Sequence, residues 1–129
     1  MLSSIFIAAS ADVGADTNPQ DHPNADIKPV DTLRLEALAK LVKASAGRLD
    51  PIDTSGEQFV IPVGDELAAK LATLDRTTIG TLAASWAEME AWGDEPPSAA
   101  DAVALLTQMC ALAAQAKCET KRVYLWLSL

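Results

Sequence analysis

The chain closes on the run KRVYLWLSL, residues 121–129, in which β-branched and aromatic side chains follow one another without glycine or proline. Residues of this kind favour a strand. Alternate positions form two sets, one beginning with Val123 and the other with Tyr124, and both sets are largely apolar. A strand that is apolar on both sides is typical of the centre of a sheet that helices cover. We therefore expect a central strand at this point of the chain.

Two further strands are predicted upstream. Residues 2–9, LSSIFIAA, are short, apolar and rich in β-favouring side chains. Residues 59–63, FVIPV, form a similar run, in which Pro62 indicates a strand end or edge because proline cannot donate to a ladder. Residues 10–29 contain three prolines among Asp, Asn and Gly, so we expect one long irregular loop there, the least ordered part of the chain.

Helical spacing of apolar residues predicts four helices between these strands. The first runs over residues 31–45 and is ended by Gly47, the second starts at Asp65, the third spans residues 77–92, and the longest spans residues 99–117 behind a Ser98 cap. The fold class expected from this order is α+β: a small sheet of about three strands, with a long C-terminal strand, packed against about four helices. A chain of 129 residues is the size of a single domain, which we assign to residues 1–129.

The second half of the chain carries a weak family pattern. A Trp-x-x-x-Glu helix, Trp86 to Glu90, precedes another helix and a terminal strand of the form Leu-Tyr-x-Trp, with Val123 in the first position here. Over about residues 59–129 this resembles small bacterial proteins without an assigned activity, and the element order is similar to that of the YfbM-like family. The resemblance implies no catalytic residues.

The net charge of −8 repels phosphate backbones and anionic lipid surfaces, which argues against nucleic-acid and membrane partners. An acidic surface keeps a protein soluble, and it can also attract a basic protein partner. No apolar run is long enough for a membrane span, and the opening residues lack the basic region of a signal peptide. Cys110 and Cys118 are eight residues apart in one predicted helix and cannot bridge each other, so two buried free thiols in a reducing, cytoplasmic compartment are expected.

The sequence lacks the motifs of several chemistries. His22 is the single histidine and lies in the predicted loop, so histidine-based metal sites and a Ser-His-acid triad are not expected. No G-x-S-x-G, G-x-G-x-x-G or P-loop motif is present, and DVGADTNPQD, residues 12–21, lacks the spacing of a calcium loop. We predict no catalytic residue, no metal and no cofactor.

The stretch SWAEMEAWG, residues 85–93, is the one candidate for a site. Helical spacing places Trp86 on an apolar stripe and Glu88 on the solvent side. Glu90 follows Trp86 by four and is expected beside the stripe, where a carboxylate is costly unless it is paired. It is then either a boundary glutamate with a structural partner or a binding or acid/base carboxylate. Trp92, at the helix end, is expected to be half exposed.

Two functions remain open from the sequence. The first is a non-enzymatic interaction protein, of the immunity or inhibitor type, that neutralises a basic protein. The alternative is a small enzyme or ligand-binding domain with a pocket between the Trp86 helix and the sheet, using Glu90 with Arg122 or Tyr124. If Trp126 lies on an exposed sheet face, that face is a candidate homodimer surface.

Overall fold

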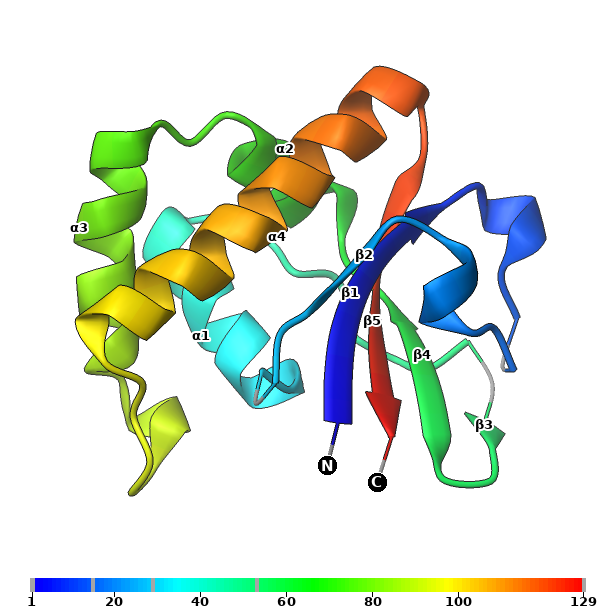
Figure 1. Ribbon diagram of the computed structural model, residues 1–129, viewed down its shortest axis with the longest axis horizontal. Coiled ribbons are helices and arrows are strands. Elements are labelled where there is room, and N and C mark those ends of the chain that lie inside the picture. The colour runs from blue at the N-terminus through cyan, green and yellow to red at the C-terminus, as the bar shows by residue number, and fades with distance from the viewer. Residues whose placement is uncertain (1, 15, 29, 53, 129) are drawn as a thin grey trace.

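The closing run forms the middle strand of a five-stranded antiparallel sheet. In the computed structural model, which describes residues 2–14, 16–28, 30–52 and 54–128, β5 (Arg122–Ser128) lies between β1 (Leu2–Ala8) and β4 (Gln58–Pro62). β2 (Asn24–Asp26) and β3 (Thr54–Ser55) complete the order β2-β1-β5-β4-β3. The predicted central position of the closing strand is confirmed. Leu2 pairs with Ser128, so the two ends of the described chain lie side by side (Figure 1).

Four helices accompany this sheet, and the α+β class is confirmed. They are α1 (Thr32–Val42), α2 (Asp65–Ala72), α3 (Arg76–Ala87) and α4 (Ala99–Glu119). The sheet has two more strands than the predicted three, because β2 and β3 are only three and two residues long. Alternation of apolar and polar residues cannot be detected over so few positions.

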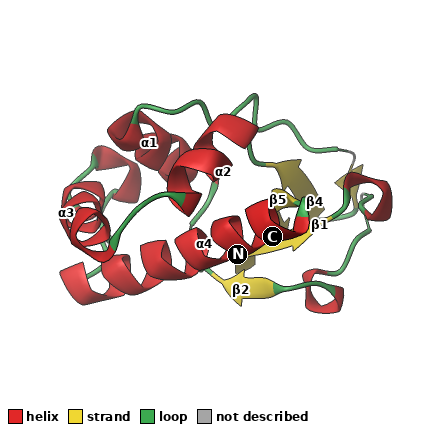
Figure 2. Ribbon diagram, turned by 90° about the horizontal axis from the view of Figure 1, so that it is seen from above, coloured by secondary structure: helices red, strands yellow, loops and turns green. Residues whose placement is uncertain are grey.

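The main core lies between the helices and one face of the sheet. Val123, Leu125 and Leu127 of β5 belong to it together with Ile5 and Ile7 of β1. Long α4 runs across the sheet, while α1, α2 and α3 gather at one end of the molecule (Figures 1 and 2). The period-2 division of the closing strand therefore sorts its residues correctly, with the Val123 set facing the helices.

Helix α4 is the largest single contributor to this core. It is long and apolar enough, by length and composition, to cross a membrane, although the sequence has no uninterrupted apolar run of that length. Seven of its side chains are buried in the protein: Ala102, Leu106, Met109, Cys110, Leu112, Ala113 and Ala116. A helix buried along one face in this way packs as a core helix.

The segment between β1 and β2 covers the other face of the sheet. It contains two 3-10 turns, η1 (Ser10–Asp12) and η2 (Pro19–Asp21), and its His22 ring stacks on Phe6 at 5.6 Å between ring centroids. Phe6 in turn stacks on Tyr124 at 5.3 Å. The prediction of one irregular loop over residues 10–29 is therefore wrong in part: β1 offers the backbone groups that pair with β2, and the aromatic stack holds the preceding turns. Its low order stays a prediction.

The end of α1 also differs from expectation. α1 ends at Val42, where Lys43 takes a left-handed conformation with φ 58°, and does not continue to residue 45. The segment after α1 passes close to the residues that follow β4. Gly64 N donates to Ala46 O at 2.7 Å, and a Cβ at Gly64 would lie 2.6 Å from the Ala46 carbonyl carbon. Glycine is thus required for this close approach. By contrast, α4 begins as predicted, with Ser98 Oγ accepting from Asp101 N at 3.1 Å.

Candidate interaction site

The two tryptophans of SWAEMEAWG pack against each other inside the protein. Trp86 is 0% and Trp92 1% exposed, and their rings meet edge to face with 5.1 Å between centroids and 65° between planes. Edge-to-face pairs of this kind add to the stabilisation from burial. The predicted core position of Trp86 is confirmed. The predicted half exposure of Trp92 is wrong.

Trp92 is buried because the chain turns before it. Helix α3 ends at Ala87, and Met89 is extended with φ −77° and ψ 149°. A short 3-10 turn, η3 (Glu90–Trp92), then brings Trp92 back onto Trp86. The prediction of one helix through residue 92 therefore fails at its last turn, where the burial of a large aromatic side chain outweighs the good helix propensity of the intervening residues.

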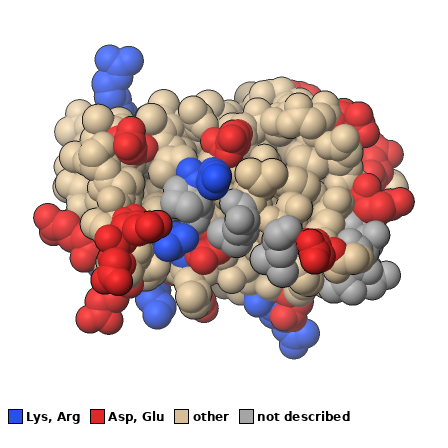
Figure 3. Space-filling model, turned by 60° about the horizontal axis from the view of Figure 1, so that its bottom comes forward, with Lys and Arg blue, Asp and Glu red and all other residues tan. Residues whose placement is uncertain are grey.

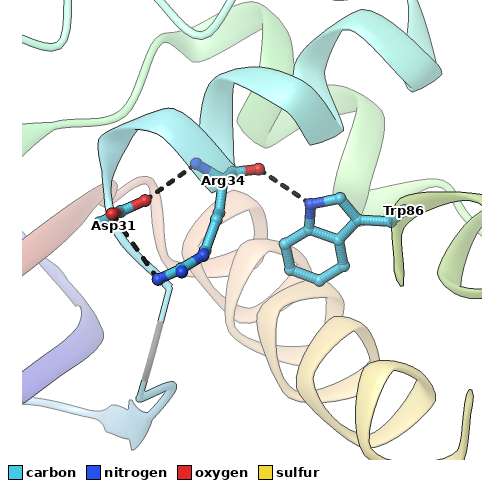
Figure 4. A network of polar contacts seen from close by, with 3 residues as sticks. All are labelled: Asp31, Arg34 and Trp86. Atoms are coloured by element: carbon cyan, nitrogen blue, oxygen red, sulfur yellow. Dashed lines mark hydrogen bonds and ion pairs between the residues drawn. The ribbon is translucent and has the colours of Figure 1, made fainter. Parts of the chain in front are cut away.

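Arg34 of α1 joins both tryptophans. Its backbone carbonyl accepts a hydrogen bond from Trp86 Nε1 at 2.9 Å, and its guanidinium lies 5.0 Å from the centroid of the Trp92 ring. Asp31, the cap of α1, accepts from Arg34 N at 3.0 Å and lies 3.7 Å from Arg34 Nη1 (Figure 4). The start of α1 is thereby fastened to the end of α3 and to η3.

This arrangement moves Glu90 away from its predicted position. Glu90 begins η3 and is exposed, as Glu88 also is. Helical spacing placed Glu90 beside the apolar stripe only on the assumption that α3 continues, and α3 stops three residues earlier. The prediction of a partly buried, paired Glu90 is therefore wrong, whereas the predicted solvent position of Glu88 is confirmed.

Glu88 and Glu90 instead line a hollow between α1 and η3. It measures about 480 Å³ and has an apolar part formed by Leu33, Ala37, Met89 and Ala91, with Glu36 and Lys40 of α1 on its rim. Leu33 is 64% exposed, the highest value among the described large hydrophobic residues. The hollow is an open groove, because five of the eight residues that line it are exposed.

The stretch of sequence that forms the η3 wall of this groove is acidic. From residue 77 to residue 116 the chain has no lysine or arginine but five carboxylates, all exposed: Glu88, Glu90, Asp94, Glu95 and Asp101. Figure 3 shows acidic side chains at both ends of the face in view, one of which is the end where η3 lies. None of the five is in an ion pair with another described residue.

The remaining two candidate residues lie elsewhere. Arg122 begins β5 just after α4, whereas η3 lies toward the start of α4, a helix of 21 residues and so about 30 Å long (Figure 1). Tyr124 is 3% exposed and stacks on Phe6 on the outer sheet face. Burial raises the pKa of its phenol, so the group stays neutral near neutral pH. The structure does not bring Glu90 together with Arg122 or Tyr124.

The two cysteines differ in burial. Cys110 is buried, and burial raises its pKa to about 11, so its thiol is unreactive. Cys118 is exposed, contrary to the expectation of two buried thiols, because it lies on the solvent side of the last turn of α4. No three His, Cys, Asp or Glu side chains among the described residues are grouped to hold a metal ion.

Sequence reasoning missed Leu33 and Arg34, two of the residues by which α1 contributes to the site. Leu33 is followed at four and seven residues by Ala37 and Lys40, which places the three on a face distinct from the buried leucines of α1. A leucine outside the core stripe was the available signal. Comparison of the chain with protein-family models, curated proteins and solved structures finds no match. The resemblance to the YfbM-like family stays a prediction.

Proposed function

We propose that this protein is a non-enzymatic interaction domain that binds a basic protein partner, in the manner of an immunity or inhibitor protein. The observation that carries the proposal is the acidic end: five exposed carboxylates in a stretch of sequence without a basic residue, two of which, Glu88 and Glu90, line an open groove. Such a field attracts a positively charged partner and speeds its encounter.

The distribution of charge supports a directed interaction. The basic residues Lys117, Lys121 and Arg122 lie at the other end of α4, about 30 Å away, where Glu119 is the one acidic residue of that end of the helix and pairs with Lys121 at 2.9 Å. A surface that served solubility alone would have its charges interspersed. The proposal includes a bacterial source and a reducing, cytoplasmic compartment, in keeping with two cysteines that form no disulfide.

The test uses a basic probe and two charge-matched variants. The probe is a 12-residue peptide of alternating lysine and serine, titrated into the ¹⁵N-labelled full chain at low salt. We expect amide shifts concentrated over residues 88–101 and an affinity that falls with ionic strength. E88Q/E90Q/E95Q should weaken binding several-fold, because it removes three charges from the acidic end.

The control variant D12N/D16N/D21N removes the same number of exposed charges from the segment over the outer sheet face. It should weaken binding much less. Equal losses in the two variants would mean that only net charge matters, and the proposed function would then be wrong.

A further inference from the structure

The groove between α1 and η3 has an apolar floor beside the carboxylates of the acidic end. Leu33, Ala37, Met89 and Ala91 provide this floor, and Leu33 alone is 64% exposed. Exposed apolar side chains enclosed by charged ones mark interaction sites when they form a continuous patch. Pure charge attraction does not require such a floor.

The rim of the groove selects the sign of its occupant. The apolar floor is surrounded by three carboxylates, those of Glu36, Glu88 and Glu90, and by one ammonium group, that of Lys40. An occupant with lysine or arginine beside its apolar residues is therefore favoured, and an acidic one is repelled. A second copy of this chain, with its own charge of −8, is disfavoured for the same reason.

Both walls of the groove are fixed by contacts behind them. On the α1 side, Arg34 follows Leu33 directly and binds Trp86 through its carbonyl group. On the η3 side, Trp92 follows Glu90 by two residues and is buried under the Arg34 guanidinium. A groove that is held open before binding loses little entropy when a partner enters it.

The size of the groove indicates what enters. Its volume of about 480 Å³ falls within the range of about 300–1,000 Å³ typical of ligand pockets, which is more room than one small side chain needs. Helical segments commonly dock their apolar face into grooves of this kind, and a methionine in the floor adapts to the side chains that arrive.

We infer that this groove binds an amphipathic helical segment of the basic partner, with leucine-like side chains on the Leu33–Met89 floor and lysine or arginine side chains beside Glu36, Glu88 and Glu90. The inference rests on the proposed function and adds to it the chemistry of the segment that is recognised.

The experiment compares peptides of equal charge. The probe is a 14-residue peptide of leucine and lysine arranged as an amphipathic helix, used below the concentration at which it self-associates. The reference is a lysine and serine peptide of the same length and charge. We expect the leucine peptide to bind the full chain at least about tenfold more tightly, the change that about 1.4 kcal/mol of apolar burial gives. The amides of Leu33, Ala37, Met89 and Ala91 should shift most.

Leu33→Ser tests the floor, and Ile52→Ser is its matched control. Both residues are exposed large hydrophobics, at 64% and 43%, so neither change should lower thermal stability appreciably. Leu33→Ser should remove most of the advantage of the leucine peptide over the serine peptide, and Ile52→Ser should leave that advantage within about twofold.

The outcomes separate the two proposals. The groove inference is wrong if the leucine peptide binds no more tightly than the serine peptide. It is also wrong if Leu33→Ser and Ile52→Ser have the same affinity for the leucine peptide. In both cases charge at the acidic end still matters. If neither peptide depends on Glu88, Glu90 and Glu95, the proposed function fails with it. Concentration-dependent self-association that Leu33→Ser abolishes would assign the groove to a second copy and overturn the inference.

Discussion

Two aromatic clusters each fasten an irregular segment to the frame of this fold, and they differ in the side chain that the segment contributes. Trp86 and Trp92 are almost wholly buried, meet edge to face and are joined to α1 by a hydrogen bond and a cation–π contact. On the outer sheet face, Phe6 stacks on Tyr124 and carries His22, a polar ring contributed by the segment itself. The first cluster is an extension of the main core, whereas the second is a cover over the sheet.

The difference shows which segment is built to stay in place. Around Trp86 and Trp92 the segment contributes its own large apolar side chain, so releasing η3 would expose a whole indole to water. The segment before β2 contributes His22, a smaller and polar ring of intermediate burial. We therefore expect the acidic end to be presented rigidly and the outer cover to open more readily.

Trp86→Ala should have the largest effect, a loss of about 3–5 kcal/mol in the free energy of unfolding, because it removes a fully buried indole and leaves a cavity. Urea unfolding followed by circular dichroism measures it. A loss below about 1 kcal/mol would contradict the depth assigned to this cluster.

Replacing each tryptophan by phenylalanine separates the polar part of the cluster from its packing. Trp86 Nε1 donates to Arg34 O, whereas Trp92 Nε1 is buried without a partner among the described residues. Trp86→Phe should cost about 1–3 kcal/mol. Trp92→Phe should cost about 1 kcal/mol less, because it also removes an unsatisfied donor.

The two phenylalanine variants are compared by their midpoints of unfolding in urea. A shared m value, the slope of the free energy of unfolding against urea concentration, makes the midpoints comparable. Equal losses of stability would mean that the Trp86 hydrogen bond contributes nothing net. A larger loss at Trp92 would contradict the assignment of its N–H group as unsatisfied.

His22→Ala tests the outer cluster and should cost about 0.5–1.5 kcal/mol, the contribution of one ring stacked on an aromatic neighbour. Limited proteolysis should then cut within residues 10–23 sooner than in the wild type, while the cutting rate near η3 stays the same. Faster cleavage at both places would mean that the two clusters are not independent.

Glu90→Gln should have the smallest effect, within about 0.5 kcal/mol, and Glu88→Gln should match it, since both side chains are exposed. Thermal unfolding of the two variants measures this. A loss above about 1 kcal/mol at Glu90 alone would restore the partly buried, paired carboxylate that helical spacing predicted.

Local patterns in the sequence were sufficient for the frame of the fold. Alternation in the closing run identified β5 and its two faces, and leucine spacing with a serine cap identified α4. Each of these signals lies within one element. Helix boundaries were less predictable. The residues of α3's last predicted turn favour a helix, and the helix ends early because Trp92 packs against Trp86 and Arg34.

One of the two walls of the groove could be predicted from the sequence. The stretch SWAEMEAWG attracted attention because it is rich in tryptophan and glutamate, and it does form one wall of the groove. The other wall comes from α1, more than fifty residues earlier, and no local pattern links Leu33 to Met89. Packing between elements created the site, so its second half had to come from the structure.

The pairing of β1 with β5 has a consequence for how the chain folds as it is made. Ile5 lies opposite Leu125, so β1 can pair with β5 only after 120 further residues have been added. At translation speeds of about 5–20 residues per second this takes about 6–24 s, during which Ile5, Phe6 and Ile7 have no sheet partner in β5. Such distant pairing also slows folding of the finished chain. Of the two strands that pair with β5, β1 therefore waits longer for this partner during synthesis than β4 does.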